Sequence, residues 1–82
     1  MESQVRAILQ ERSGLGEAVQ GIGIHESLWL LGMTSLASVE VMLALEAAFD
    51  FEFPESRLRH ATFATIFNIM RCIKELTESS VR

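Results

Sequence analysis

Apolar residues near the start of the chain recur at helical spacing. Val5, Ile8 and Leu9 stand at positions i, i+3 and i+4, which puts them on one face of a helix over about residues 2–12. The stretch 13–16 should end this helix, because glycine leaves the backbone free to adopt other conformations. Residues 14–33 are predicted to form a long loop with five glycines, in which Trp29 acts as an anchor. Its large apolar side chains, including those at 28–31, should largely be covered, so we expect the loop to pack along the domain.

The segment 35–49 is predicted to be a helix with apolar residues on two sides. Thr34 precedes it as an N-cap, since its hydroxyl can accept a hydrogen bond from a first-turn amide. The side expected to enter the core carries Val41, Met42, Leu45, Ala48 and Phe49. The opposite side carries Leu36, Val39, Leu43 and Ala47, flanked by Glu40 and Glu46. The two glutamates are costly to bury, so this side should face solvent and bind partners, unless the long loop covers Leu36 and Leu43.

The rest of the chain is predicted to be helical as well. Pro54 favours the start of a short helix over 55–59, and Thr62 is expected to cap a last helix over 63–78. The last helix has one broad apolar face, made of Ile66, Ile69, Met70, Ile73 and Leu76. No segment alternates as a strand would. The expected fold is therefore all-α, a small four-helix bundle of three longer helices and one short one, with a long loop between the first two helices.

Length, cysteine content and charge narrow the class of protein. The 82 residues allow one domain, 1–82, and the single cysteine, Cys72, rules out an intramolecular disulfide and favours a reducing cytosol. The N-terminus lacks the pattern of a signal peptide, and every apolar run is interrupted well before about 18 residues, the length of a membrane span. The net charge of −4 disfavours nucleic acid. We expect a cytoplasmic monomer that binds neither nucleic acid nor membrane and meets basic partner surfaces.

Catalytic and metal sites find little support in the sequence. His25, His60 and Cys72 lack the spacing of metal ligands, and the Gly-x-Gly pairs complete no dinucleotide-binding fingerprint. A nucleophilic pair of Ser35 with His25 or His60 would still need an orienting acid and an oxyanion hole. We therefore expect no enzyme activity and no metal. Cys72 is expected to be a small packing residue.

Ser35 is the candidate for covalent chemistry. It stands in the first turn of the predicted helix 35–49, where free amides and a partial positive charge would favour a phosphodiester on its oxygen. Gly32 would permit an enzyme to approach the backbone closely. Taken alone, a serine at this position is more often a helix cap than a modified residue.

Two runs of sequence resemble the acyl and peptidyl carrier protein family. The run 28–40 resembles its attachment segment, a leucine-containing loop followed by Gly-x-x-Ser-Leu and an apolar helix with glutamates. The run 45–55 is similar to the step from that helix into a short helix, and Thr62 matches the threonine that opens the last helix. The similarity covers about residues 2–78. It implies that a phosphopantetheinyl transferase moves 4′-phosphopantetheine from coenzyme A to Ser35. The arm's thiol, not Cys72, would then hold an acyl or aminoacyl group as a thioester, loaded by a ligase and passed to downstream acyl-transfer enzymes.

The chain also departs from many members of that family. Thr34 stands where many have an aspartate that is thought to assist the transferase, and Arg57, Arg59 and His60 make the segment after Pro54 basic. Gly-Met-Thr-Ser-Leu resembles stand-alone carriers that receive an amino acid. Predicted partner-binding residues are Met33, Thr34, Leu36, Val39, Glu40, Leu43, Glu46, Ala47 and Arg57. The alternative is an unmodified helical module that binds a partner through the same face.

Overall fold

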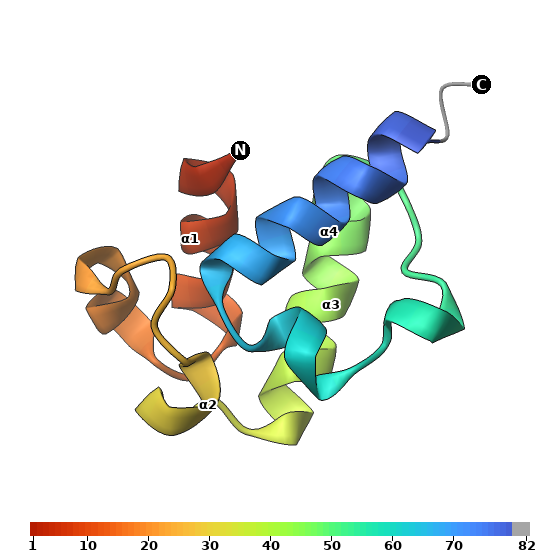
Figure 1. Cartoon of the computed structure of the whole chain (residues 1–82). Helices are drawn as coiled ribbons and strands as arrows, with labels where there is room; N and C mark the ends of the chain where they lie inside the picture. Colours follow the sequence, from red (N-terminus) through yellow and green to blue (C-terminus); the bar gives the residue numbers. More distant parts are fainter. Residues whose placement is uncertain (80–82) are drawn as a thin grey trace.

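The structure is a computed structural model that describes residues 1–79, and it is all-α as predicted (Figure 1). Its α-helices are α1 (Glu2–Arg12), α2 (Leu28–Leu31), α3 (Ser35–Phe49) and α4 (Ile66–Ser79). Three 3₁₀ turns are η1 (Gly16–Gly21), η2 (Glu55–Arg57) and η3 (His60–Phe63). The three long helices agree with the expected bundle, whereas the short α-helix, α2, lies within the predicted loop and not at 55–59. No strand occurs within residues 1–79.

The bounds of α1 and α3 agree with the sequence prediction. At the start of α3 the Thr34 hydroxyl accepts a hydrogen bond from the Ala37 amide at 3.1 Å, so Thr34 is the N-cap. The helix ends at Phe49 and is capped by Asp50, which adopts a left-handed conformation (φ 55°) that Asp tolerates better than most residues. These two residues fix where α3 begins and ends, and so they fix the position of Ser35 in its first turn.

The connection between α1 and α3 is more ordered than a loop. The turn α2 is bounded by the Ser27 hydroxyl, which accepts from the Leu30 amide at 3.2 Å, and by Gly32 at φ 119°. The connection packs along the domain as expected. Its Leu28 amide donates to the Ala64 carbonyl at 2.7 Å, and the Ile24 carbonyl accepts from the Phe67 amide at 2.8 Å. These two bonds tie the connection to the entry of α4.

The segment before α4 differs from the prediction. The last helix begins at Ile66 because the Thr65 hydroxyl, not that of Thr62, accepts from the Asn68 amide at 2.9 Å. Thr62 lies inside η3, where its amide donates to the Arg59 carbonyl at 3.1 Å. The predicted short helix 55–59 is reduced to η2, because hydrogen bonds between residues three apart tighten this turn and end it early. The turn η3 follows at residues 60–63.

The core lies between the three long helices. Helix α1 contacts both α3 and α4, and α4 crosses α3 in the view of Figure 1. The buried apolar residues are Val5, Leu9, Val19, Leu28, Met33, Val41, Leu45, Phe53, Phe63, Ile66, Ile69, Cys72 and Ile73. Cys72 is a core residue, as predicted. Ala48 was expected in the core as well but is exposed, because it lies at the edge of the apolar face of α3.

Candidate functional site

Ser35 is the first residue of α3 and is exposed. The Thr34 cap beside it satisfies one of the first-turn amides, and the Ser38 hydroxyl donates to the Ser35 carbonyl at 2.6 Å. The Ser35 side chain therefore sits on a fixed backbone at the positive end of a fifteen-residue helix. A negatively charged group attached to its oxygen would be stabilised there.

A groove of about 300 Å³, the serine groove, begins beside this hydroxyl. It is lined by Trp29, Ser35, Ser38, Val39, Met42, Leu58, Arg59, His60 and Phe63. Trp29 forms one wall, because its indole N–H donates to the His60 carbonyl at 2.9 Å and its ring stacks on the His60 ring at 4.2 Å. These contacts join α2 to η3 beside the N-terminal end of α3. The groove is mostly apolar with polar atoms near Ser35, which suits an elongated ligand.

Sequence reasoning gave Trp29 its anchoring role but missed the other side of this groove. Leu58, His60 and Phe63 come from η3 and the residues before it. The sequence placed Leu58 and Phe63 in helices with other bounds and left His60 between those helices. The stacked pair of Trp29 and His60 is separated by 31 residues in the chain, so no local pattern could have indicated it.

The outward face of α3, made of Leu36, Val39, Glu40, Leu43 and Ala47, is exposed as predicted. The exposed fractions of Leu36, Val39 and Leu43 are 74%, 48% and 56%, so the alternative that the long loop covers Leu36 and Leu43 is wrong. Neighbouring α2 adds to the apolar surface, because Leu30 is 90% and Leu31 43% exposed. The expectation that the loop's leucines are largely covered holds for Leu28 and fails for these two.

Three other predicted partner residues have structural roles. Met33 is only 4% exposed and belongs to the core, so its assignment to the partner surface is corrected. Its position between the αL residue Gly32 and the cap Thr34 turns its side chain inward. Thr34 is exposed, but its hydroxyl is engaged in capping. Glu46 is half-buried and its Oε2 accepts from the Phe53 amide at 2.9 Å, which ties the segment after α3 back to the helix.

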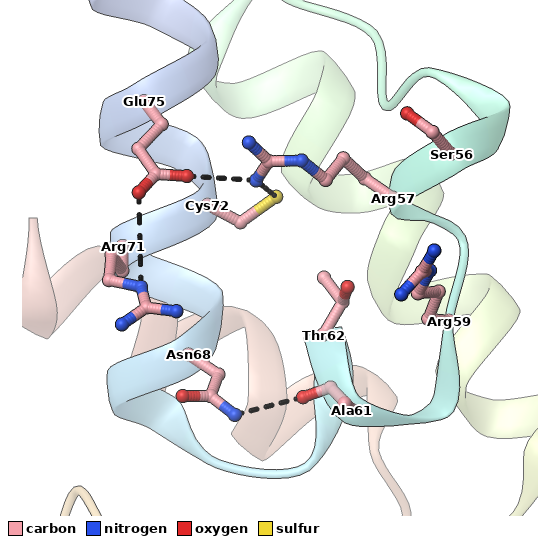
Figure 2. A pocket seen from close by; sticks show the side chains of 9 residues that line it. All are labelled: Ser56, Arg57, Arg59, Ala61, Thr62, Asn68, Arg71, Cys72 and Glu75. Carbon is pink, nitrogen blue, oxygen red and sulfur yellow. Dashed lines mark hydrogen bonds and ion pairs between the residues drawn. The ribbon is translucent and has the colours of Figure 1, made fainter.

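Arg57 lies in a second pocket, the arginine basin, of about 460 Å³ (Figure 2). Its lining residues are Ser56, Arg57, Arg59, Ala61, Thr62, Asn68, Arg71, Cys72 and Glu75. One nitrogen of Arg57 lies 2.9 Å from Glu75 Oε1 and donates to the Cys72 sulfur at 3.4 Å. The hydrogen bond to Glu75 raises the pKa of Arg57, so the guanidinium stays charged. Burial raises the pKa of the Cys72 thiol, and the contact with Arg57 offsets only part of that rise.

The rings of the two histidines each pack against an aromatic side chain. The His25 ring packs at 4.8 Å from the Phe67 ring, and His60 stacks on Trp29. Although His60 shares the serine groove with Ser35, no hydrogen bond joins the two side chains in the part of the chain that the structure describes. Within that part, no group of three or more histidine, cysteine, aspartate or glutamate residues could hold a metal ion. Nor is any helix there long and apolar enough to cross a membrane.

Comparison with known proteins identifies the family. Residues 3–73 match the family described as phosphopantetheine attachment site, which accounts for most of the chain. The chain belongs to this family. It is thus a carrier protein that holds an acyl or aminoacyl group as a thioester on a covalently attached 4′-phosphopantetheine, as its resemblance to acyl and peptidyl carriers implied.

Individual relatives agree in sequence and in structure. The chain is 38% identical over 74 residues to an aminoacyl carrier protein of Agrobacterium fabrum. The matched region covers 90% of this chain and 89% of the relative. The chain is also similar, at 38% identity, to a carrier protein from Agrobacterium tumefaciens. That protein was crystallised with an engineered Bradyrhizobium japonicum glycine:[carrier protein] ligase and AMP. The TM-score is 0.86, with 90% of this chain and 99% of that chain covered. A solution structure from Agrobacterium tumefaciens is similar at 35% identity and a TM-score of 0.77, covering 98% and 96%.

Proposed function

We propose that this carrier bears its 4′-phosphopantetheine on Ser35 and transports an amino acid. The observation that carries the proposal is the position of Ser35, an exposed hydroxyl in the first turn of α3 at the mouth of the serine groove. The Gly-x-x-Ser-Leu run around it supports the same assignment. The amino acid as cargo is supported by the similarity to an aminoacyl carrier protein and to a carrier seen with a glycine:[carrier protein] ligase.

The residues around Ser35 fit such a group. The Ser35 oxygen would lose its proton and bond to the phosphorus of the arm as the pyrophosphate bond of coenzyme A breaks and the nucleotide part leaves. The positive end of α3 would stabilise the negative charge of the resulting phosphodiester. The serine groove would orient the rest of the arm along Trp29, Val39 and Met42. When bound, the arm supplies a terminal thiol that holds cargo as a thioester. The chain's own residues hold the arm and present its cargo to partner enzymes, and we infer that they catalyse nothing.

The outward face of α3 is proposed to contact the enzymes that act on the carrier. These are the phosphopantetheinyl transferase, a cargo-loading ligase and downstream acyl-transfer enzymes. Leu36 and Leu43 are large, exposed and about two helical turns apart on the same side of α3, so one partner groove can cover both. Glu40 between them, exposed on the same helix, would pair with a basic residue at the rim. Monomeric state, cytoplasmic location and lack of nucleic-acid binding stay predictions from the sequence.

Attachment of the arm is tested by intact mass. The chain is incubated with coenzyme A and a broad-specificity transferase, and the wild type is expected to gain one phosphopantetheinyl group. Ser35→Ala should gain none. Ser38→Ala is the matched control, since Ser38 lies one helical turn away in the same groove, and it should be modified like the wild type. No gain in the wild type with several transferases would favour the unmodified interaction module, and Thr34→Asp would then be the next variant.

The cargo is tested separately on carrier that already bears the arm. The Bradyrhizobium japonicum glycine:[carrier protein] ligase with ATP and glycine is expected to load it, giving an adduct that hydroxylamine removes as it removes a thioester. A fatty-acid ligase serves as comparison and should load it poorly. Clean loading by the fatty-acid ligase, with none by amino-acid ligases, would contradict the aminoacyl assignment and leave the attachment at Ser35 intact.

A further inference from the structure

The arginine basin stands out because its charge opposes that of the whole chain. Three arginines and one glutamate line it, so the lining carries +2 in a protein whose formal net charge is −4. A second hollow, at the C-terminal end of α3, has the opposite sign and is lined by Glu46, Asp50 and Glu52 among others. The surface is therefore polarised, with one basic and one acidic depression.

The arginines of the basin are only partly neutralised from within the protein. Glu75 serves two of them, with Oε1 at 2.9 Å from Arg57 and Oε2 at 3.9 Å from Arg71. Arg59 is exposed and makes no ion pair with any residue in the range 1–79. Figure 2 shows the side chain of Arg57 reaching toward Cys72 and Glu75 on α4, while Arg59 lies beside its own loop and has no dashed contact with the other residues drawn. At least Arg59, and in part Arg71, are thus available to an outside carboxylate.

The place of the basin connects it to the carrier's task. Arg59 lines both the arginine basin and the serine groove, so a partner that contacts Arg59 also lies beside the arm on Ser35. A single small anion would gain little from exposed arginines in water. A protein surface with several carboxylates can instead engage the guanidinium forks of more than one arginine at once.

We propose that the arginine basin is a second docking surface, which receives an acidic patch of the amino-acid ligase that loads the carrier. This inference rests on the proposed function. The outward face of α3 would supply apolar contact, while the basin orients the carrier about Ser35 and directs the arm toward the ligase's active site. The acidic hollow at the far end of α3 opposes docking in the reversed orientation, since like charges would then meet.

The test compares two charge reversals on the carrier that bears its arm. Arg59→Glu lies in the basin, while Lys74→Glu makes the same change at an exposed position of α4 outside the basin. Loading by the glycine:[carrier protein] ligase is followed as a function of carrier concentration and salt. For Arg59→Glu we expect KM to rise about tenfold or more at low salt with kcat nearly unchanged, and the difference in KM from the wild type to shrink as the salt concentration is raised. Lys74→Glu should stay within about twofold of the wild type.

Three results would overturn the inference. The first is the same KM for Arg59→Glu and Lys74→Glu. The second is a loss in Arg59→Glu that is confined to kcat. The third is no loading of the wild-type carrier by this ligase. Arg71→Glu provides a second basin variant and should also raise KM. Because the mass of each carrier shows the arm before loading begins, a failure of Ser35 modification is seen separately from a failure of the basin.

Discussion

Helices α3 and α4 have fifteen and fourteen residues, but they distribute their apolar side chains differently. In α4 the large apolar residues Ile66, Ile69 and Ile73 are completely buried, and charged residues such as Arg71 and Glu75 are exposed. In α3 only Val41 and Leu45 are completely buried, while Leu36 and Leu43 on the other side are more than half exposed.

This difference separates residues that fold the protein from residues that serve its partners. The apolar face of α4 is used up by the core, so its sequence follows from stability alone. Helix α3 carries more apolar surface than the core can cover, in a domain too small to cover it elsewhere. An exposed apolar patch of this kind marks a surface that another molecule covers. Substitutions on the buried apolar face of α4 should therefore affect stability, and substitutions on the outward face of α3 should affect binding.

The largest expected effect is on stability and falls on α4. Ile73→Ala removes a completely buried side chain and should lower the free energy of unfolding by about 2–5 kcal/mol. Leu43→Ala on α3 should change it by less than about 0.5 kcal/mol, because Leu43 is exposed. Urea denaturation followed by circular dichroism measures both. Similar losses for the two variants would contradict the division between the helices.

The next effect concerns binding and falls on α3. Leu43→Asp should weaken docking of the loading ligase by more than about 1 kcal/mol, or at least fivefold in affinity, since it places a charge in the apolar contact. Ala48→Asp is the matched control, because it puts the same residue on an exposed position of the same helix away from the outward face. Isothermal titration of each carrier variant with the ligase gives the affinities. If Leu43→Asp and Ala48→Asp bind equally well, the outward face is wrongly assigned.

A smaller effect tests which threonine caps the start of α4. Thr65→Ala should cost about 1 kcal/mol of stability, because the Asn68 amide loses its capping partner. Thr62→Ala should cost less than about 0.5 kcal/mol, since Thr62 caps no helix here. Thermal unfolding of the two variants distinguishes the structure from the prediction made on sequence alone. A larger loss at Thr62 would return the helix start to residue 63.

The smallest expected effect is at Cys72. Burial raises the pKa of its thiol, so at neutral and mildly alkaline pH it stays protonated and should react slowly with iodoacetamide. Raising the pH should speed the reaction only above the pH range in which an ordinary thiol ionises. Unfolding in urea should abolish the protection. On the carrier that bears its arm, one fast thiol and one slow thiol are expected, and Cys72→Ala should leave cargo loading unchanged. Fast labelling of Cys72 in the folded carrier would contradict its placement.

The sequence predicted the elements whose ends are set by local chemistry. The spacing of Val5, Ile8 and Leu9 and the cap at Thr34 gave α1 and α3 with their observed bounds. It failed where two local signals compete over a few residues. Thr62 and Thr65 are both plausible caps, and the choice depends on η3, which is held by the contact of Trp29 with His60 from far along the chain.

The candidate site shows the same limit. The position of Ser35 and the exposure of Leu36 and Leu43 follow from the helical period, so they could be predicted. Met33 was misplaced because its direction is set by the left-handed Gly32 before it, and Leu30 was missed because α2 is a single turn with no period to read. The serine groove and the arginine basin are formed by segments distant in sequence, so only the fold brings them together.

The most direct test of the account locates the arm on one residue. Trypsin cleaves after Arg12 and Arg57, which leaves Ser35 in the peptide 13–57 together with Thr34 and Ser38. Tandem mass spectrometry of this peptide, from carrier treated with coenzyme A and a transferase, should place one phosphopantetheinyl group on Ser35. An unmodified peptide, or a group on Thr34 or Ser38 in its place, would contradict the central claim.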